Sequence, residues 1–118
     1  MMKKERVAVY QDAVAYMKDH LFDKLRVNDI ARHCMVCTSG LEKHFARCAK
    51  KGVMRYFLDL KLEYAADMLK KGYSVNYLAK ILNFSSSAHF SMAFKKKYGT
   101  SPLKYKYSEV NIEVASNY

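Results

Sequence analysis

Residues 78–105 read LAKILNFSSSAHFSMAFKKKYGTSPLKY, and this stretch decides the fold. A short apolar segment of helical period is followed by a turn around Asn83 and by a second such segment over 87–98. Asn tolerates the left-handed backbone that a tight turn requires. Two short helices joined by a turn of about three or four residues form a helix-turn-helix. Ser101 and Pro102 then predict a last short helix, because Ser caps a helix and Pro fits its first turn.

An earlier part of the chain repeats this pattern. Residues 27–32 (VNDIAR) correspond to residues 75–80 (VNYLAK) at an offset of 48, and Leu41 corresponds to Phe90 at an offset of 49. Self-similarity of this kind indicates two copies of one structural unit. The predicted helices are 27–34 and 38–48 in copy one, and 75–82 (with Ser74 as N-cap) and 87–98 in copy two.

The rest of the chain also follows a helical period. Four glycines and one proline occur, and no alternating pattern typical of strands runs far. Residues 6–20 predict an opening helix, and 53–70 a long helix that is apolar on two sides and therefore packed on two sides. We expect an all-α, homeodomain-like fold of about seven helices, with two helix-turn-helix subdomains joined by a connector helix. The expected division is a first subdomain at 1–52, the connector at 53–71, a second subdomain at 72–107 and a tail at 108–118.

Composition narrows the class of partner. The chain carries 21 Lys and Arg against 11 Asp and Glu, a formal net charge of +10, which points first to nucleic acid. No apolar run reaches the roughly 18 residues of a membrane span, and no signal peptide is recognisable. We therefore expect a cytoplasmic, nucleoid-associated protein with no membrane partner, and reduced thiols at its three cysteines. Neither a glycine-rich phosphate loop nor a carboxylate pair is apparent, so no enzymatic activity and no cofactor are expected.

The spacing within residues 78–105 resembles the signature of the AraC/XylS family of bacterial transcription regulators. A looser match extends back to Ile30 and brings the resemblance to about 100 of the 118 residues. The resemblance implies a seven-helix domain whose two recognition helices enter successive major-groove segments on one face of DNA. The residues that carry it are Leu78, Ala79, Asn83, Phe84, Phe90, Phe94, Lys95, Gly99, Ser101, Pro102 and Tyr105.

Copy one departs from the regular pattern at two points. The bulky Met35 stands where copy two has Asn83, so we expect a turn of different geometry. Lys50 stands where copy two has Gly99, and a left-handed cap at a non-glycine residue costs about 1 kcal/mol. That cost is avoided if Gly52 ends the helix instead.

The second helix of a helix-turn-helix meets base edges with its N-terminal part. In copy one the family's base-contacting positions fall on Ser39, Glu42 and Lys43. Lys43 is suited to donate to guanine and Glu42 to accept from cytosine. A solvated helix face is the alternative interpretation of these residues, and the resemblance favours base contact for Lys43.

In copy two the same positions form a short and weakly polar surface of Ser87, Ala88, Ser91 and Met92. Such a surface discriminates bases less sharply, so we expect copy one to choose the sequence and copy two to hold the DNA. For each basic residue taken singly, a solvated side chain is an equal alternative, and clustering favours contact. The predicted phosphate contacts are Thr38, Arg47, Lys95, Lys96, Lys97 and Lys104.

A different interpretation starts from Cys34, Cys37, His44 and Cys48, whose spacing resembles a metal-binding knuckle. We favour structural thiols and no metal, because these residues coincide with the turn and second helix of copy one. The leading hypothesis is sequence-specific binding of double-stranded promoter DNA and regulation of transcription, with activation as the expected direction. A metal- or redox-sensing Cys/His module with secondary DNA binding is the second hypothesis, and non-specific packaging of nucleic acid is the third. RNA polymerase is an expected further partner. If this chain is part of a longer protein, we expect an N-terminal sensor domain to precede it.

Overall fold

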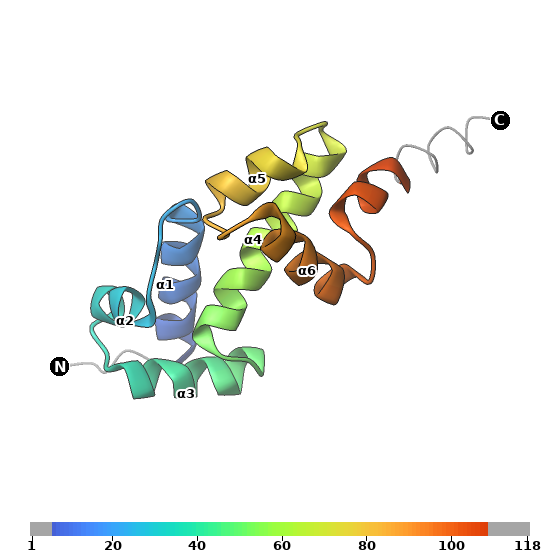
Figure 1. Cartoon of the computed structure of the whole chain (residues 1–118). Coiled ribbons are helices and arrows are strands. Elements are labelled where there is room, and N and C mark those ends of the chain that lie inside the picture. Colours follow the sequence, from blue (N-terminus) through green and yellow to red (C-terminus); the bar gives the residue numbers. More distant parts are fainter. Residues whose placement is uncertain (1–5, 109–118) are drawn as a thin grey trace. The chain divides into compact units, whose positions relative to one another are not determined.

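A computed structural model describes residues 6–108, and helices make up most of this part of the chain (Figure 1). No strand occurs among the described residues, so the predicted all-α class is confirmed. The last described segment, residues 102–108, is helical, and the predicted tail lies outside the described residues from 109 onward. The other helices are α1 (Arg6–Asp19), α2 (Val27–Cys34), α3 (Thr38–Ala49), α4 (Val53–Lys70), α5 (Val75–Ile81) and α6 (Ser87–Tyr98).

The chain divides into two compact units, residues 1–60 and 61–118. The boundary falls inside α4, the helix that was predicted to connect the two copies. Each unit therefore contains one helix-turn-helix together with part of α4. Within the described residues, no helix is both long enough and apolar enough to cross a membrane.

The first unit is built around one cluster of buried apolar side chains. Leu41 and Phe45 of α3 are fully buried, and the Phe45 ring lies edge-on to Tyr10 and Tyr56 at centroid distances of 5.0 and 5.4 Å. Burial of this kind contributes about 1.5–3 kcal/mol for each large side chain. The position of α3 therefore depends on α1, α2 and α4. The buried members of the cluster are Val9, Ala13, Met17, Ile30, Ala31, Cys34, Leu41, Phe45, Val53 and Phe57.

The second unit repeats this scheme. Phe90 and Phe94 of α6 are fully buried, as are Leu78 and Leu82. Phe94 contacts Tyr105 edge-on at 5.3 Å, which joins α6 to the helix at 102–108. Of the residues expected to face inward on the two second helices, Leu41, Phe45, Phe90 and Phe94 are buried. Cys48 was expected on the inward side of α3 as well, but it is exposed, because it lies in the last turn beyond the buried Phe45. Leu62, Ala65, Ala66 and Leu69 of α4 are buried in the same half of the chain.

The turn of copy one does not differ from that of copy two, which corrects the expectation at Met35. Met35 and Asn83 both adopt left-handed backbone, with φ of 60° and 63°. In copy one the N–H groups of residues 35 and 36 donate to the carbonyls of residues 32 and 31, and in copy two those of 83 and 84 donate to 80 and 79. This is the Schellman pattern in both turns. Since its bonds involve only the backbone, Met35 adopts the geometry with its side chain 89% exposed.

The ends of the second helices follow the same rule. Lys50 caps α3 with φ of 61°, and Gly99 caps α6 with φ of 77°. Gly52 is not among the residues with positive φ, so it does not take over the stop. Lys50 therefore carries the unfavourable conformation that the sequence suggested. The predicted caps Ser74 and Ser101 are confirmed, because their hydroxyl oxygens accept hydrogen bonds from Tyr77 N and Lys104 N.

Candidate nucleic-acid interface

One side of α3 forms an exposed polar stripe. Leu41 and Phe45 occupy the buried side, while Ser39, Lys43 and Arg47 are exposed and follow one another at intervals of four residues. Residues four apart share one helix face, so these three side chains form a continuous surface. No acidic residue occurs in the first turn of α3, which leaves the positive end of the helix uncompensated there.

The corresponding stripe of α6 has a different chemistry. An offset of 49 relates Ser39, Lys43 and Arg47 to the exposed residues Ala88, Met92 and Lys96. Met92 is 72% exposed, so the middle of this stripe is apolar. The two second helices therefore expose equivalent positions with different side chains. The stripe of α3 is polar and cationic, whereas that of α6 is apolar and has a lysine only in its last turn.

The other predicted contacts are less uniform. Thr38, Ser87 and Ser91 are half-buried, whereas Lys95 and Lys104 are exposed. The ammonium group of Lys97 lies 3.6 Å from the Glu63 carboxylate and near the face of the Tyr98 ring, so its charge is partly neutralised within the protein.

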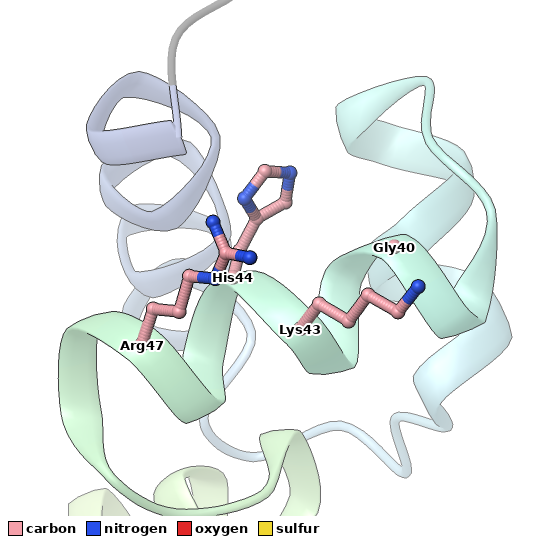
Figure 2. A pocket seen from close by; sticks show the side chains of 4 residues that line it. All are labelled: Gly40, Lys43, His44 and Arg47. Carbon is pink, nitrogen blue, oxygen red and sulfur yellow. The ribbon is translucent and has the colours of Figure 1, made fainter.

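A small hollow of about 220 Å³ lies against the exposed face of α3 (Figure 2). Gly40, Lys43, His44 and Arg47 line it, and Figure 2 shows the side chains of Lys43 and His44 leaving one turn of α3 and that of Arg47 the next. The buried Nδ1 atom of His44 has no hydrogen-bond partner within the part of the chain that the structure describes. Neither Gly40 nor His44 is among the DNA contacts predicted from the sequence. Gly40 precedes Lys43 by three residues and His44 precedes Arg47 by three, and this helical spacing is the signal that could have placed them on this face.

The N-termini of α3 and α6 are capped in parallel ways. The Cys37 sulfur accepts a hydrogen bond from Gly40 N at 3.4 Å, and the Ser86 hydroxyl oxygen accepts one from His89 N at 3.0 Å. The Ser39 hydroxyl lies 3.5 Å from the Cys37 sulfur. Hydrogen bonding from Ser39 and from the Gly40 backbone lowers the pKa of the Cys37 thiol below its ordinary value of 9.0. Cys37 is exposed and, as the N-cap, lies at the end of α3 where the stripe begins.

Glu42 has a partner that its place on an exposed helix did not suggest. One of its carboxylate oxygens accepts a hydrogen bond from Val53 N, the first residue of α4, at 3.0 Å. Glu42 was predicted to contact a base, and its carboxylate lies where two helices of the first unit meet.

The cysteines occupy three different environments. Cys34 is buried and its thiol donates to the carbonyl of Val9, Cys37 caps α3, and Cys48 is exposed. Among the described residues, no group of three or more His, Cys, Asp or Glu side chains is arranged to hold a metal ion. The metal- or redox-sensing interpretation therefore gains no support from this region.

Comparison with known proteins adds independent observations. A family model described as a helix-turn-helix domain matches residues 30–108. The uncharacterised helix-turn-helix-type transcriptional regulator YidL of Escherichia coli K12 is 37% identical over 90 residues, which are 75% of this chain and 30% of that protein. The MmsAB operon regulatory protein of Pseudomonas aeruginosa is 29% identical over 93 residues, or 78% of this chain and 30% of that protein. The chain thus spans about 30% of the length of these relatives.

Solved structures with the same fold include DNA-binding domains of transcription regulators. A transcriptional regulator from Chromobacterium violaceum, described as an AraC-type DNA-binding domain-containing protein, superposes with a TM-score of 0.80 at 25% identity. That match covers 83% of this chain and 88% of the other. The DNA-binding domain of AdpA, crystallised with a target DNA, shares the fold with a TM-score of 0.77 at 20% identity, over 85% of this chain and 90% of that one.

Proposed function

Because the chain belongs to the AraC/XylS family of helix-turn-helix transcription regulators, we propose that it is the part of a bacterial regulator that recognises specific promoter DNA. The observation that carries the proposal is the pair of equivalent exposed stripes, Ser39–Lys43–Arg47 on α3 and Ala88–Met92–Lys96 on α6. In a helix-turn-helix this face of the second helix lies in the major groove.

On α3 we assign base contacts to Ser39 and Lys43, and phosphate contacts to Thr38 and Arg47. Lys43 lies in the second turn, exposed and on the stripe, where it can donate to guanine O6 and N7. Glu42 is left out of the base contacts because its carboxylate already accepts a hydrogen bond from Val53 N.

On α6 the proposed contacts are of a more general kind. Ala88 and Met92 can touch thymine methyl groups, and Ser87 and Ser91 can donate to or accept from several base edges. The lysines of the last turn follow directly and suit the phosphate backbone. The phosphate contacts proposed here are Lys95, Lys96, Lys97 and Lys104, with Lys97 the weakest because it pairs with Glu63.

The biological setting follows from this role. Activation of transcription through contact with RNA polymerase is the proposed outcome, in the cytoplasm and at the nucleoid, without enzymatic activity of its own. A sensor domain preceding this unit fits the length of the curated relatives, which extend well beyond the matched region.

Selection of binding sites from random duplex DNA with the purified chain tests the proposal. We expect enrichment of one motif, with the preference at one of its base pairs lost when Lys43 is replaced by Ala. Met54→Ala serves as the control, because Met54 is a partly exposed residue of α4 outside the two stripes. A pool that stays random after repeated selection would favour non-specific packaging of nucleic acid and reject the proposed function.

A further inference from the structure

The start of α4 lacks the side chain that normally caps a helix. Gly52 is its N-cap, since the carbonyl of Gly52 accepts the first helical bond from Tyr56 N at 3.0 Å. Glycine offers no oxygen to the free N–H groups of the first turn. The next residue, Val53, is fully buried, so its N–H needs a partner within the protein.

In copy two, the N-terminus of the helix that follows the recognition helix is capped in a different way. At an offset of 49, Ser101 and Pro102 occupy the positions of Gly52 and Val53. The Ser101 hydroxyl oxygen accepts from Lys104 N at 3.2 Å, and Pro102 has no N–H that needs an acceptor. Copy one has neither device at its own junction.

Glu42 supplies what is missing in copy one. Its Oε1 atom accepts from Val53 N at 3.0 Å in a partly buried position. A Cβ atom added at Gly52 would stand 3.5 Å from the same oxygen, so the carboxylate lies beside the place of the absent cap side chain. A carboxylate at a helix N-terminus is favourable both as a charged acceptor and because of the helix dipole.

A second contact secures the same junction. The Lys51 ammonium group lies 2.5 Å from a carboxylate oxygen of Asp59, which is only 8% exposed. The segment between α3 and α4 is therefore held by two contacts, that of Glu42 with Val53 N and that of Lys51 with Asp59. Lys43, the proposed base reader, is the immediate neighbour of Glu42.

We propose that Glu42 is a positioning residue of the recognition helix: its carboxylate completes the N-terminus of α4 and so sets the orientation of α3. The proposal rests on the proposed function, in which α3 lies in the major groove. A residue that acts in this way influences affinity for every DNA sequence equally, whereas a base-reading glutamate influences one base pair.

The test compares Glu42→Ala in two backgrounds. One is the natural chain, and the other carries Gly52→Ser with Val53→Pro, which copies Ser101 and Pro102. The Gly52→Ser change does not conflict with the backbone, since Gly52 has no positive φ and an added Cβ meets only an ordinary contact. Binding is measured on the selected duplex and on each of its single-base variants.

In the natural chain we expect Glu42→Ala to weaken binding by a similar factor on every duplex, about 3- to 30-fold if the loss matches that of a helix cap. In the Ser-Pro background the same substitution should have little effect, because proline at position 53 has no N–H that could donate to the Glu42 carboxylate. Asp67→Ala is the control for the added net charge, since Asp67 is an exposed acid of α4 in the other unit.

A loss confined to one base pair would overturn the proposal and return Glu42 to the base readers. An equal loss in both backgrounds, or no loss in the natural chain, would overturn it as well. If the Ser-Pro background does not fold, the sequence profile of Glu42→Ala in the natural chain decides alone. Failure of the proposed function is recognised separately, because the natural chain itself would then show no preference among duplexes.

Discussion

Lys43 and Lys96 provide the sharpest test of how the two recognition helices divide their work. Replacement of either by Ala lowers the formal net charge equally, from +10 to +9, so the long-range attraction to DNA changes by the same amount. The two lysines differ in place. Lys43 lies in the second turn of α3, whereas Lys96 lies near the end of α6, and both are exposed.

The expected magnitudes follow from these places. A bidentate contact from Lys43 to guanine is worth about 1–3 kcal/mol of discrimination, or roughly 5- to 150-fold at one base pair. A phosphate contact from Lys96 carries no sequence information, and its loss lowers the slope of log affinity against log salt by about 0.9. Between about 50 and 200 mM salt, the Lys96→Ala variant should therefore lose about 3.5-fold less affinity than the natural chain.

Fluorescence anisotropy with a labelled duplex, its single-base variants and several salt concentrations measures both effects. We expect Lys43→Ala to reduce the preference at one position and to leave the other positions as they were. Lys96→Ala should weaken all duplexes alike. The opposite pattern, with uniform weakening by Lys43→Ala and a changed base preference in Lys96→Ala, would refute the assignment of base reading to α3.

Two further predictions concern the ends of the recognition helices. Lys50→Gly relieves a left-handed cap with φ of 61° and should raise the free energy of unfolding by about 1 kcal/mol, which corresponds to about 4 °C in Tm. Gly99→Lys should lower the free energy of unfolding by a similar amount. Urea denaturation measures both changes, and shifts of the same sign would contradict the reasoning. At Cys37 the lowered pKa means that more thiolate is present near neutral pH than in an ordinary cysteine, so alkylation followed by mass spectrometry should show a pH midpoint below 9.0. A midpoint at or above 9.0 would show that Ser39 and the Gly40 backbone do not stabilise the thiolate.

Much of the fold was predictable because its signals are local. The helix bounds 27–34, 53–70 and 87–98 agree with α2, α4 and α6, since apolar period and capping residues act within one or two turns of the chain. The turn at Met35 was predicted wrongly. There, a pattern of backbone hydrogen bonds outweighs the preference of the side chain, and the buried residues on both sides of the turn hold that pattern in place.

The candidate site, too, has one part that the sequence predicts and another that only the tertiary structure decides. The stripe of Ser39, Lys43 and Arg47 follows from helical spacing once Leu41 and Phe45 are recognised as buried, and the sequence alone was enough for that. The sequence also determined the family, because the spacing of its signature depends on order along the chain. The partner of Glu42 was decided only by the tertiary structure. Val53 lies eleven residues away, beyond the end of α3, and whether the carboxylate reaches its N–H depends on how two helices cross, which no local period encodes.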